Sequence, residues 1–450
     1  MKHERVSRAG VWRSAVATVA LAATLSACGA LKGDGPEDTP TLGDRVPILS
    51  KIETGAKVDP ALAGVPVQLP AAIPNAEWAQ AGGSASKSYG HLALAETPVK
   101  AWTASVAGSS TKQRLAASPV IGGGLLYVYD TDGVVHAFNE QTGARAWRHS
   151  FEVKGDGSNS VFGGGASFAD GKLYVTTGTG QVAALDAATG TELWQIQPAG
   201  PLRGSPTIAF GALYVMTQDN QVISLNLADG AVQWTEAGSQ GQSGVFGVAA
   251  PAAGQGTVIA GFSSGELIAY RYENGRNLWA DALARTSIST SVGTLTDVDA
   301  DPIIDGGAVY ALGQGGRMAA YELVTGQRIW ELNLAGISTP AVGGNWIFVL
   351  TDDARVLAIA RSTGSVKWIA DLPKYRKEED EKGELFWSGP VLAGGRLWLT
   401  NTEGEIYTVD GVSGASTRFG DVGSKISLAP VVANNTLYVL DDSGRITAFR

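Results

Sequence analysis

The stretch ALDAATGTELW, Ala184–Trp194, decides the fold, because similar stretches recur along most of the chain. They are AFNEQTGARAW (137–147), SLNLADGAVQW (224–234), AYRYENGRNLW (269–279), AYELVTGQRIW (320–330) and AIARSTGSVKW (358–368). A seventh copy, TVDGVSGASTR (408–418), has Arg418 in place of the tryptophan. Self-similarity at a regular period is the signature of a repeat architecture. We therefore predict a chain built from copies of one structural unit.

Each unit has the pattern of four antiparallel strands. Every copy follows a stretch such as SPVIGGGLLYVYDTDGVV (118–135), in which runs rich in Val, Leu and Tyr are separated by Gly-Gly or Asp-Gly. Such runs indicate strands, and such pairs indicate tight hairpins. Within the repeat, Asp186 can bond its own backbone, and Gly190 can adopt the positive φ that a turn requires.

The spacing of the repeat predicts the number of units. Seven tryptophans mark it: Trp102, Trp147, Trp194, Trp234, Trp279, Trp330 and Trp368. These positions and Arg418 are separated by 45, 47, 40, 45, 51, 38 and 50 residues, which fits the four-stranded blade of a β-propeller. The last unit ends at Arg450 after its third strand, whereas no complete unit precedes Trp102. We predict an all-β, eight-bladed propeller over residues 89–450, in which an N-terminal strand completes the last blade.

A seven-bladed ring is the alternative architecture. In either ring, the tryptophans are expected to pack between neighbouring blades, each burying about 150–250 Å². We interpret all seven as structural blade-docking residues. A platform that binds carbohydrate or peptide is the alternative role.

The N-terminus has the pattern of an exported lipoprotein. Four Lys or Arg within residues 2–13 precede an apolar run over 15–25 that is too short to span a bilayer. The following Leu-Ser-Ala-Cys resembles the lipobox of bacterial lipoproteins, and Cys28 is the only cysteine. We predict a signal peptide over 1–27 and a lipid anchor at Cys28; Gly29 favours the periplasmic face of the outer membrane. An ordinary signal peptide with an incidental cysteine is the alternative.

Residues 28–88 are predicted to hold the lipid anchor and a tether. Seven of the 18 prolines fall between positions 36 and 74, and little periodicity is present, which is typical of an extended linker. A cap packed on the propeller is the alternative, because Trp78 and Gly82-Gly83 lie near the end of this segment. The charged run at 371–387 is expected to form a solvated loop or short helix; a second contact site is its alternative.

No motif in the chain indicates catalysis. The four histidines lack metal-ligand spacing, and neither a G-x-S-x-G elbow nor a phosphate-binding glycine loop is present. Loss of residues 1–27, with four basic residues and one Glu, takes the totals of 34 basic and 43 acidic residues to 30 and 42. This acidic balance argues against a nucleic-acid partner. We predict no catalytic residue, no bound metal and no cofactor.

The pattern A-x-D-x-x-T-G-x-x-x-W resembles the tryptophan-docking repeat of propellers that bind pyrroloquinoline quinone (PQQ). Residues 184–194 match it at every fixed position. Two kinds of protein share this repeat: the quinoprotein dehydrogenases, and the BamB family of lipoproteins that assist insertion of outer-membrane β-barrels. The dehydrogenases generally carry adjacent cysteines at the cofactor and long insertions between blades. This chain has one cysteine and short connections, which favours the BamB family.

A second resemblance concerns GTLTDVDADPIIDGGAVYAL (293–312), which is similar to a segment of BamB proteins. It implies that Asp297 and Asp299 lie on the face that contacts the periplasmic domain of BamA, the barrel insertase. In the family, a loop with Leu and Arg before a Gly supplies the other half of the contact surface. Alignment through GVFGVAAP (244–251) places Val245 and Phe246 there, so the arginine is missing.

From the residues alone, the Asp-x-Asp run has other interpretations. It fits a solvated turn, or a calcium loop if Asp301 and Asp305 add oxygen ligands that converge on one point. The sequence does not distinguish these interpretations from a binding patch for a basic partner.

The resemblance implies a non-enzymatic scaffold of the outer-membrane β-barrel assembly machinery. Its expected partners are BamA, the other lipoproteins of the machine, unfolded outer-membrane proteins, and the outer membrane through the lipid anchor. A PQQ-dependent periplasmic dehydrogenase, or a degenerate quinoprotein, is the main alternative. A propeller that binds an envelope polymer is a third.

Overall fold

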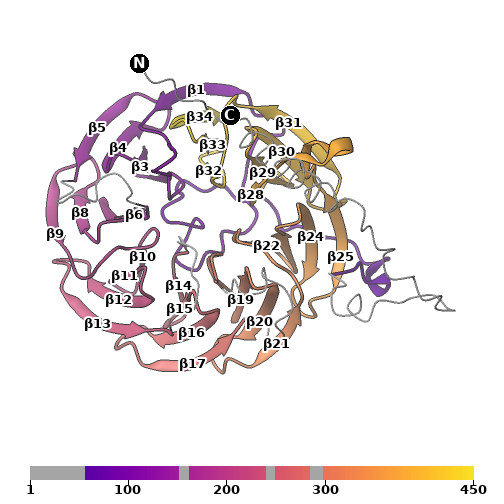
Figure 1. The fold of residues 1–450 in the computed structure, drawn as a ribbon, viewed down its shortest axis with the longest axis horizontal. Coiled ribbons are helices and arrows are strands. Elements are labelled where there is room, and N and C mark those ends of the chain that lie inside the picture. The colour runs from indigo at the N-terminus through magenta and orange to yellow at the C-terminus, as the bar shows by residue number, and fades with distance from the viewer. Residues whose placement is uncertain (1–55, 152–161, 240–248, 284–296) are drawn as a thin grey trace, which may run out of the picture. The chain divides into compact units, whose positions relative to one another are not determined.

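Short strands rich in Val, Ile, Leu and Tyr alternate with tight turns along the chain, as expected for half-buried sheets. The structure is a computed structural model that describes residues 56–151, 162–239, 249–283 and 297–450. In these ranges, eight four-stranded antiparallel sheets are arranged in a ring around a central axis (Figure 1). The prediction of an eight-bladed propeller is confirmed. We number the blades 1 to 8 in chain order.

Each blade runs from its innermost strand, at the axis, to its outermost strand (Figure 1). Blades 1 to 4 are β2 (Val120–Gly122), β3 (Leu125–Tyr129), β4 (Val134–Asn139), β5 (Arg145–Ser150); β6 (Gly164–Ala169), β7 (Lys172–Thr177), β8 (Val182–Asp186), β9 (Glu192–Ile196); β10 (Thr207–Ala209), β11 (Ala212–Met216), β12 (Gln221–Asn226), β13 (Val232–Ala237); and β14 (Ala252–Gly254), β15 (Thr257–Gly261), β16 (Glu266–Arg271), β17 (Asn277–Ala282). Blades 5 to 8 are β18 (Ile303–Asp305), β19 (Ala308–Gly313), β20 (Arg317–Glu322), β21 (Arg328–Leu332); β22 (Ala341–Gly343), β23 (Trp346–Leu350), β24 (Arg355–Ala360), β25 (Val366–Asp371); β28 (Trp387–Ala393), β29 (Arg396–Asn401), β30 (Glu405–Asp410), β31 (Ser416–Asp421); and β32 (Val431–Ala433), β33 (Thr436–Leu440), β34 (Arg445–Phe449), β1 (Lys100–Ser105).

The ring closes through the two ends of the propeller sequence. Strand β1 pairs antiparallel with β34, so that Trp102 lies opposite Ala448. The N-terminal strand is thus the outermost strand of blade 8, which confirms the predicted closure.

The repeat tryptophans stand between neighbouring blades. The Trp279 Nε1 donates a hydrogen bond of 2.8 Å to the Leu323 carbonyl in the next blade. A glycine of the repeat turn lies under each ring: a Cβ added to Gly190 would come within 2.5 Å of the Trp147 indole. Gly190 also has a φ of 73°, so both turn geometry and close approach require glycine there. Equivalent Nε1 bonds to the next blade are made by Trp102, Trp147, Trp194, Trp234 and Trp330.

Arg418 departs from this pattern because of the ring closure. In blade 8 the third and fourth strands come from opposite chain ends, so no repeat turn joins them. A tryptophan in blade 7 would have no glycine turn to dock against. Arg418 instead pairs with Glu405 and Asp421 on its own blade, each at 2.9 Å.

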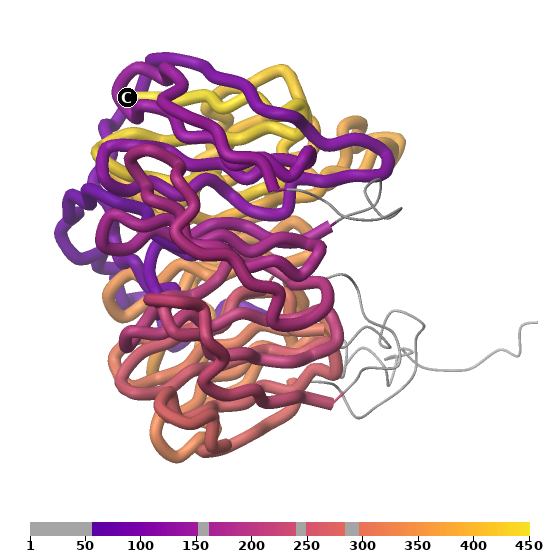
Figure 2. Tube along the Cα trace, turned by 90° about the vertical axis from the view of Figure 1, so that its left-hand side faces the viewer, coloured from indigo at the N-terminus to yellow at the C-terminus, as the bar shows by residue number. Residues whose placement is uncertain are grey.

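Residues 56–99, which we call the strap, run along one end of the central channel before entering β1 (indigo in Figures 1 and 2). They include the short 3-10 helix η2 (Pro60–Leu62), whose first turn is capped by the side chain of Asp59. Trp78 and Ile121 of blade 1 exchange both backbone hydrogen bonds, at 3.0 and 2.9 Å. The Phe168 amide of blade 2 then donates to the carbonyl of the next strap residue.

This pattern continues around the ring. The remaining strap bonds to innermost strands are Gln80 to both backbone groups of Ile208, Ala253 N–H to Ala85, Ile304 N–H to Ser86, Leu92 N–H to Leu392, and the Asn75 amide to Val432. An innermost strand is a sheet edge with unpaired backbone groups, and the strap pairs many of them. The finding corrects the prediction of an extended tether for residues 56–88 and favours the alternative, a cap. Residues 1–27 and Cys28 lie outside the described ranges.

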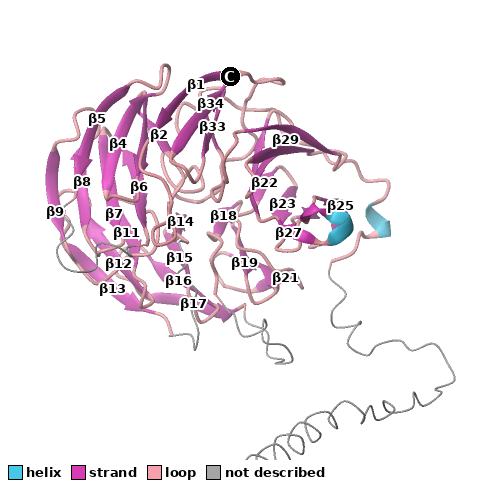
Figure 3. Ribbon diagram, turned by 45° about the horizontal axis from the view of Figure 1, so that its top comes forward, coloured by secondary structure: helices cyan, strands magenta, loops and turns pink. Residues whose placement is uncertain are grey.

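The charged run between blades 6 and 7 forms a small hairpin rather than a plain loop. Its elements are β26 (Tyr375–Lys377), η4 (Glu378–Asp380) and β27 (Lys382–Glu384), and β26 pairs with β27 (Figure 3). Within the described ranges, no helix has the length and apolar character needed to cross a membrane.

Candidate functional site

The two ends of the central channel are built differently. At one end lies the strap, and we call this the strap end. At the opposite end, the outermost strand of each blade connects to the innermost strand of the next, and we call this the open end. Asp297 and Asp299 belong to the open end, in the connection from β17 to β18.

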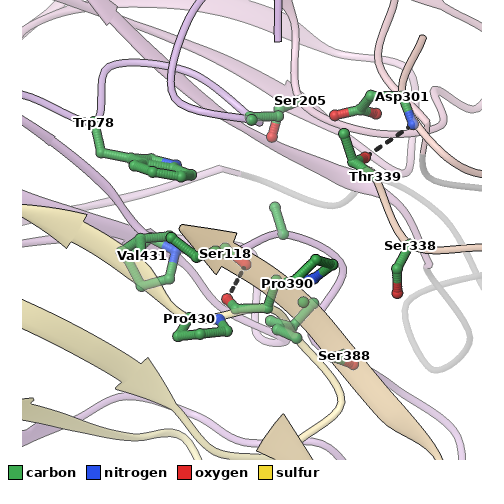
Figure 4. A pocket seen from close by; sticks show the side chains of 18 of the residues that line it. Trp78, Ser118, Ser205, Asp301, Ser338, Thr339, Ser388, Pro390, Pro430 and Val431 are labelled. Carbon is green, nitrogen blue, oxygen red and sulfur yellow. Dashed lines mark hydrogen bonds between the residues drawn. The ribbon is translucent and has the colours of Figure 1, made fainter. Parts of the chain in front are cut away.

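A cavity of about 240 Å³ lies on the axis between the two ends (Figure 4). We call it the axial cavity. The strap residues Trp78 and Tyr89 form its aromatic side, with ring centroids 4.8 Å apart. Its polar lining includes Ser118, Ser205, Asp299, Asp301, Ser338 and Thr339, all from open-end connections. The cavity therefore joins an apolar surface to a wall that carries hydroxyls and carboxylates.

Asp297 is buried and already paired. Both of its carboxylate oxygens accept hydrogen bonds from the Arg203 Nη2, at 3.0 and 3.1 Å, and each side chain is 1 % exposed. Burial raises the pKa of Asp297, and the Arg203 charge opposes that rise. In this structure the Asp297 carboxylate therefore lies inside the ring, paired with Arg203, and its role in partner binding stays a prediction.

Arg203 connects four consecutive blades. Its carbonyl accepts from the Gly164 amide of blade 2, and its own amide donates to Met216 of blade 3. Its guanidinium reaches the Gly261 carbonyl of blade 4 at 3.4 Å, and Asp297 before blade 5. A charged pair held this way fixes the open-end connections relative to one another.

Asp299 is the more exposed of the two predicted aspartates. Its side chain is 11 % exposed and lines the axial cavity. Its Oδ1 lies 3.9 Å from the Arg203 Nη2, too far for a hydrogen bond, and has no hydrogen-bond partner among the described residues. Burial and the neighbouring Asp297 charge raise the pKa of Asp299 to about 7, against the effect of Arg203. The ionised form of Asp299 is therefore disfavoured in the free chain, and a positive group placed beside it would stabilise that form.

The calcium interpretation is not supported by where the other carboxylates point. Asp301 accepts from the Ala250 amide at 2.7 Å, and burial raises its pKa against the opposing effect of the Lys87 charge. Asp305 pairs with Arg361 and accepts from the Ser88 hydroxyl. These carboxylates are engaged by donors in separate places instead of converging on one point. No group of three or more acidic, His or Cys side chains suited to a metal occurs in the described part of the chain.

Two predicted contact residues, Val245 and Phe246, lie outside the described ranges. Sequence reasoning also missed Arg203, and it named Trp78 and Gly82-Gly83 only in support of the alternative of a cap. One signal was available for the ring of connections: a proline directly precedes the innermost strand in six blades and lies within the innermost strand, β28, of a seventh. These prolines are Pro119, Pro206, Pro251, Pro302, Pro340, Pro390 and Pro430. No pattern marks Arg203.

Comparisons with known proteins agree on one family. A family model described as "Outer membrane protein assembly factor BamB" matches residues 131–370. The assembly factor BamB of Shigella dysenteriae serotype 1 is 32 % identical over 355 residues, which cover 78 % of this chain and 88 % of that protein.

Solved structures show the same fold. The crystal structure of BamB from Moraxella catarrhalis has a TM-score of 0.66 at 20 % identity, over 78 % of this chain and 99 % of that one. A europium-containing methanol dehydrogenase has a TM-score of 0.65 at 14 % identity, over 81 % of this chain and 89 % of that one. At such identities these likenesses establish the propeller architecture alone.

Proposed function

This chain belongs to the family of the outer membrane protein assembly factor BamB, and from that premise we propose that it acts as a scaffold in outer-membrane β-barrel assembly. In this role it docks through its open end on the periplasmic domain of the barrel insertase BamA. The other lipoproteins of the machine and unfolded outer-membrane proteins are its further partners.

The proposed docking surface rests mainly on the environment of Asp299. Of the two predicted aspartates, Asp299 is the more exposed, at 11 % against 1 % for Asp297, and its Oδ1 has no hydrogen-bond partner among the described residues. The same end carries Ile337, which is half exposed beside the axial cavity. A carboxylate next to an exposed apolar side chain suits a partner surface that combines a basic group with an apolar anchor. Val245 and Phe246 belong to this proposed surface by the family alignment.

The placement of the protein follows from the N-terminal sequence. We propose that signal peptidase removes residues 1–27 and that acylated Cys28 holds the chain on the periplasmic face of the outer membrane. Several acyl chains, at about 0.8 kcal/mol per buried methylene, would anchor the ring without a transmembrane helix.

A scaffold is favoured over the quinoprotein alternative by family membership and by the sequence. The relatives that define the family are named assembly factors. The adjacent cysteines typical of the dehydrogenases have no counterpart, because Cys28 is the only cysteine in the chain.

The test is the charge reversal Asp299→Arg, with binding of the insertase's periplasmic domain measured by calorimetry. We expect affinity to fall at least tenfold, since the arginine would face the partner's basic group. The matched control is Asp229→Arg, on an exposed turn at the strap end, which should bind normally. Asp297→Arg is unsuitable, because it would bury a second cation against Arg203. Unchanged affinity of a folded Asp299→Arg variant would remove Asp299 from the interface.

A further inference from the structure

Among the described residues, the lining of the axial cavity contains two carboxylates, Asp299 and Asp301, and no Lys or Arg side chain. Arg203 pairs with Asp297 at hydrogen-bond distance. Burial lowers the pKa of Lys87, a strap residue, to about 8 and raises the pKa of Asp301, and the charge of each residue opposes the shift of the other. Asp299 has no basic side chain within hydrogen-bond distance among the described residues. Asp352 adds further negative charge close by and contributes to the raised pKa of Asp299.

The unbalanced charge is not relieved by hydrogen bonding. Lys87 donates to the Ala81 carbonyl and to Thr207 Oγ1, at 3.0 and 3.1 Å, so its ammonium is engaged away from Asp299. The Asp299 Oδ1 is shielded from solvent and has no donor among the described residues. A buried carboxylate without a donor costs free energy unless a cation or a proton reaches it.

The shape of the cavity indicates what kind of cation fits. The aromatic rings of Trp78 and Tyr89 and the side chain of Val431 provide an apolar surface (Figure 4). Thr339 accepts a hydrogen bond of 3.0 Å from the Asp301 amide, and Ser338 lies beside it (Figure 4). The volume, about 240 Å³, is below the roughly 300–1,000 Å³ of pockets for drug-sized ligands, so the occupant is small.

We propose that the axial cavity is a binding site for an organic cation, a guanidinium or ammonium group on a short apolar stem. The cationic head lies against Asp299, and the stem lies over Trp78 and Tyr89. A cation supplies the donors that the Asp299 Oδ1 lacks, and the aromatic faces attract both the stem and the positive charge. A free small amine and an arginine or lysine side chain of a docking protein share this chemistry.

The first experiment titrates agmatine, a guanidinium on a four-carbon stem, into the full chain and follows binding by calorimetry. The Asp299→Asn variant keeps the shape and removes the charge, so we expect at least tenfold weaker binding. Asp229→Asn, at the strap end, should bind as the unmodified chain does. Butanol, which has the stem without the charge, and guanidinium, which has the head without the stem, should each bind at least tenfold more weakly.

The pH dependence provides a second readout. Asp299 must be ionised to hold the cation, so affinity should rise from pH 6 to pH 8, through the pKa of about 7. The charges that face it, Asp297, Arg203 and Asp352, belong to the same profile. In Asp299→Asn the rise should disappear. Absence of agmatine binding, or equal binding by a folded Asp299→Asn variant, would overturn the proposal.

Competition identifies the source of the cation. If agmatine and the insertase's periplasmic domain exclude each other, the natural occupant is a basic side chain of that partner. If both bind together, the occupant is a free amine. Binding of agmatine by a chain that does not bind the insertase would sink the proposed docking function and leave this site intact.

Discussion

The strap end and the open end of the propeller channel differ in how their buried polar groups are bonded. At the strap end, edge groups of the innermost strands are paired by residues 56–99, and the buried Lys87 has two acceptors. At the open end, a buried ion pair holds the connections together, and Asp299 is left without a donor. The difference teaches that backbone and side-chain hydrogen bonds from one segment close the strap end, whereas the open end keeps a buried carboxylate oxygen without a donor. Functional sites commonly retain such local conflicts.

Removal of the strap should have the largest effect. Deletion of residues 56–92 exposes the edge groups of six or more inner strands and removes the buried Trp78. At about 1 kcal/mol per hydrogen bond and about 3 kcal/mol for the tryptophan, the free energy of unfolding should fall by roughly 5–10 kcal/mol. Urea unfolding measures this. Val99→Ala, at an exposed strap position, is the control, and a loss below about 2 kcal/mol for the deletion would show that the ring does not need its strap.

Loss of the Arg203–Asp297 ion pair at the open end should cause the second largest fall in the free energy of unfolding. Arg203→Met preserves the length of the side chain and leaves Asp297 as an unpaired buried charge, at a cost of about 3–5 kcal/mol. Adding Asp297→Asn removes that charge, so the double variant should be more stable than Arg203→Met alone. A double-mutant cycle in urea quantifies the coupling. Purely additive losses would mean that the two side chains do not depend on each other.

Asp299→Asn should raise the free energy of unfolding at pH 8, and this is the smallest of the three expected effects. The pKa of Asp299 is about 7 in the folded chain and about 3.9 when unfolded, so ionisation disfavours the folded state above pH 7. The variant should therefore be more stable than the unmodified chain at pH 8, by roughly 1–4 kcal/mol. This advantage should shrink as pH falls from 7 toward 4, where both states are protonated. Thermal unfolding across pH 4–8 tests the sign, which a loss of stability at pH 8 would contradict.

The ring was predictable from sequence because its determinants are local and periodic. Trp194 and Gly190 belong to one turn pattern that repeats, so eight blades and the closing strand could be inferred by counting. The strap could not be, since it uses backbone groups and single side chains such as Gln80, which leave no period. Arg203 and Asp297 are 94 residues apart, and nothing in either neighbourhood marks the pair. Sequence spacing also could not reveal that Asp297 is buried deeper than Asp299.

The closure between β1 and β34 has a consequence for the order of folding. Strand β1 is synthesised before all the blades, whereas β34, its sheet partner in the described part of the chain, belongs to the last blade. Blades 1 to 7 are each contiguous in sequence and can form by local pairing, whereas blade 8 requires a contact across nearly the whole propeller. Contacts of such sequence separation are slow because the loop they close is long. We therefore expect ring closure to be the last and rate-limiting step of folding, with β1 exposed to other pairing partners until β34 has been synthesised.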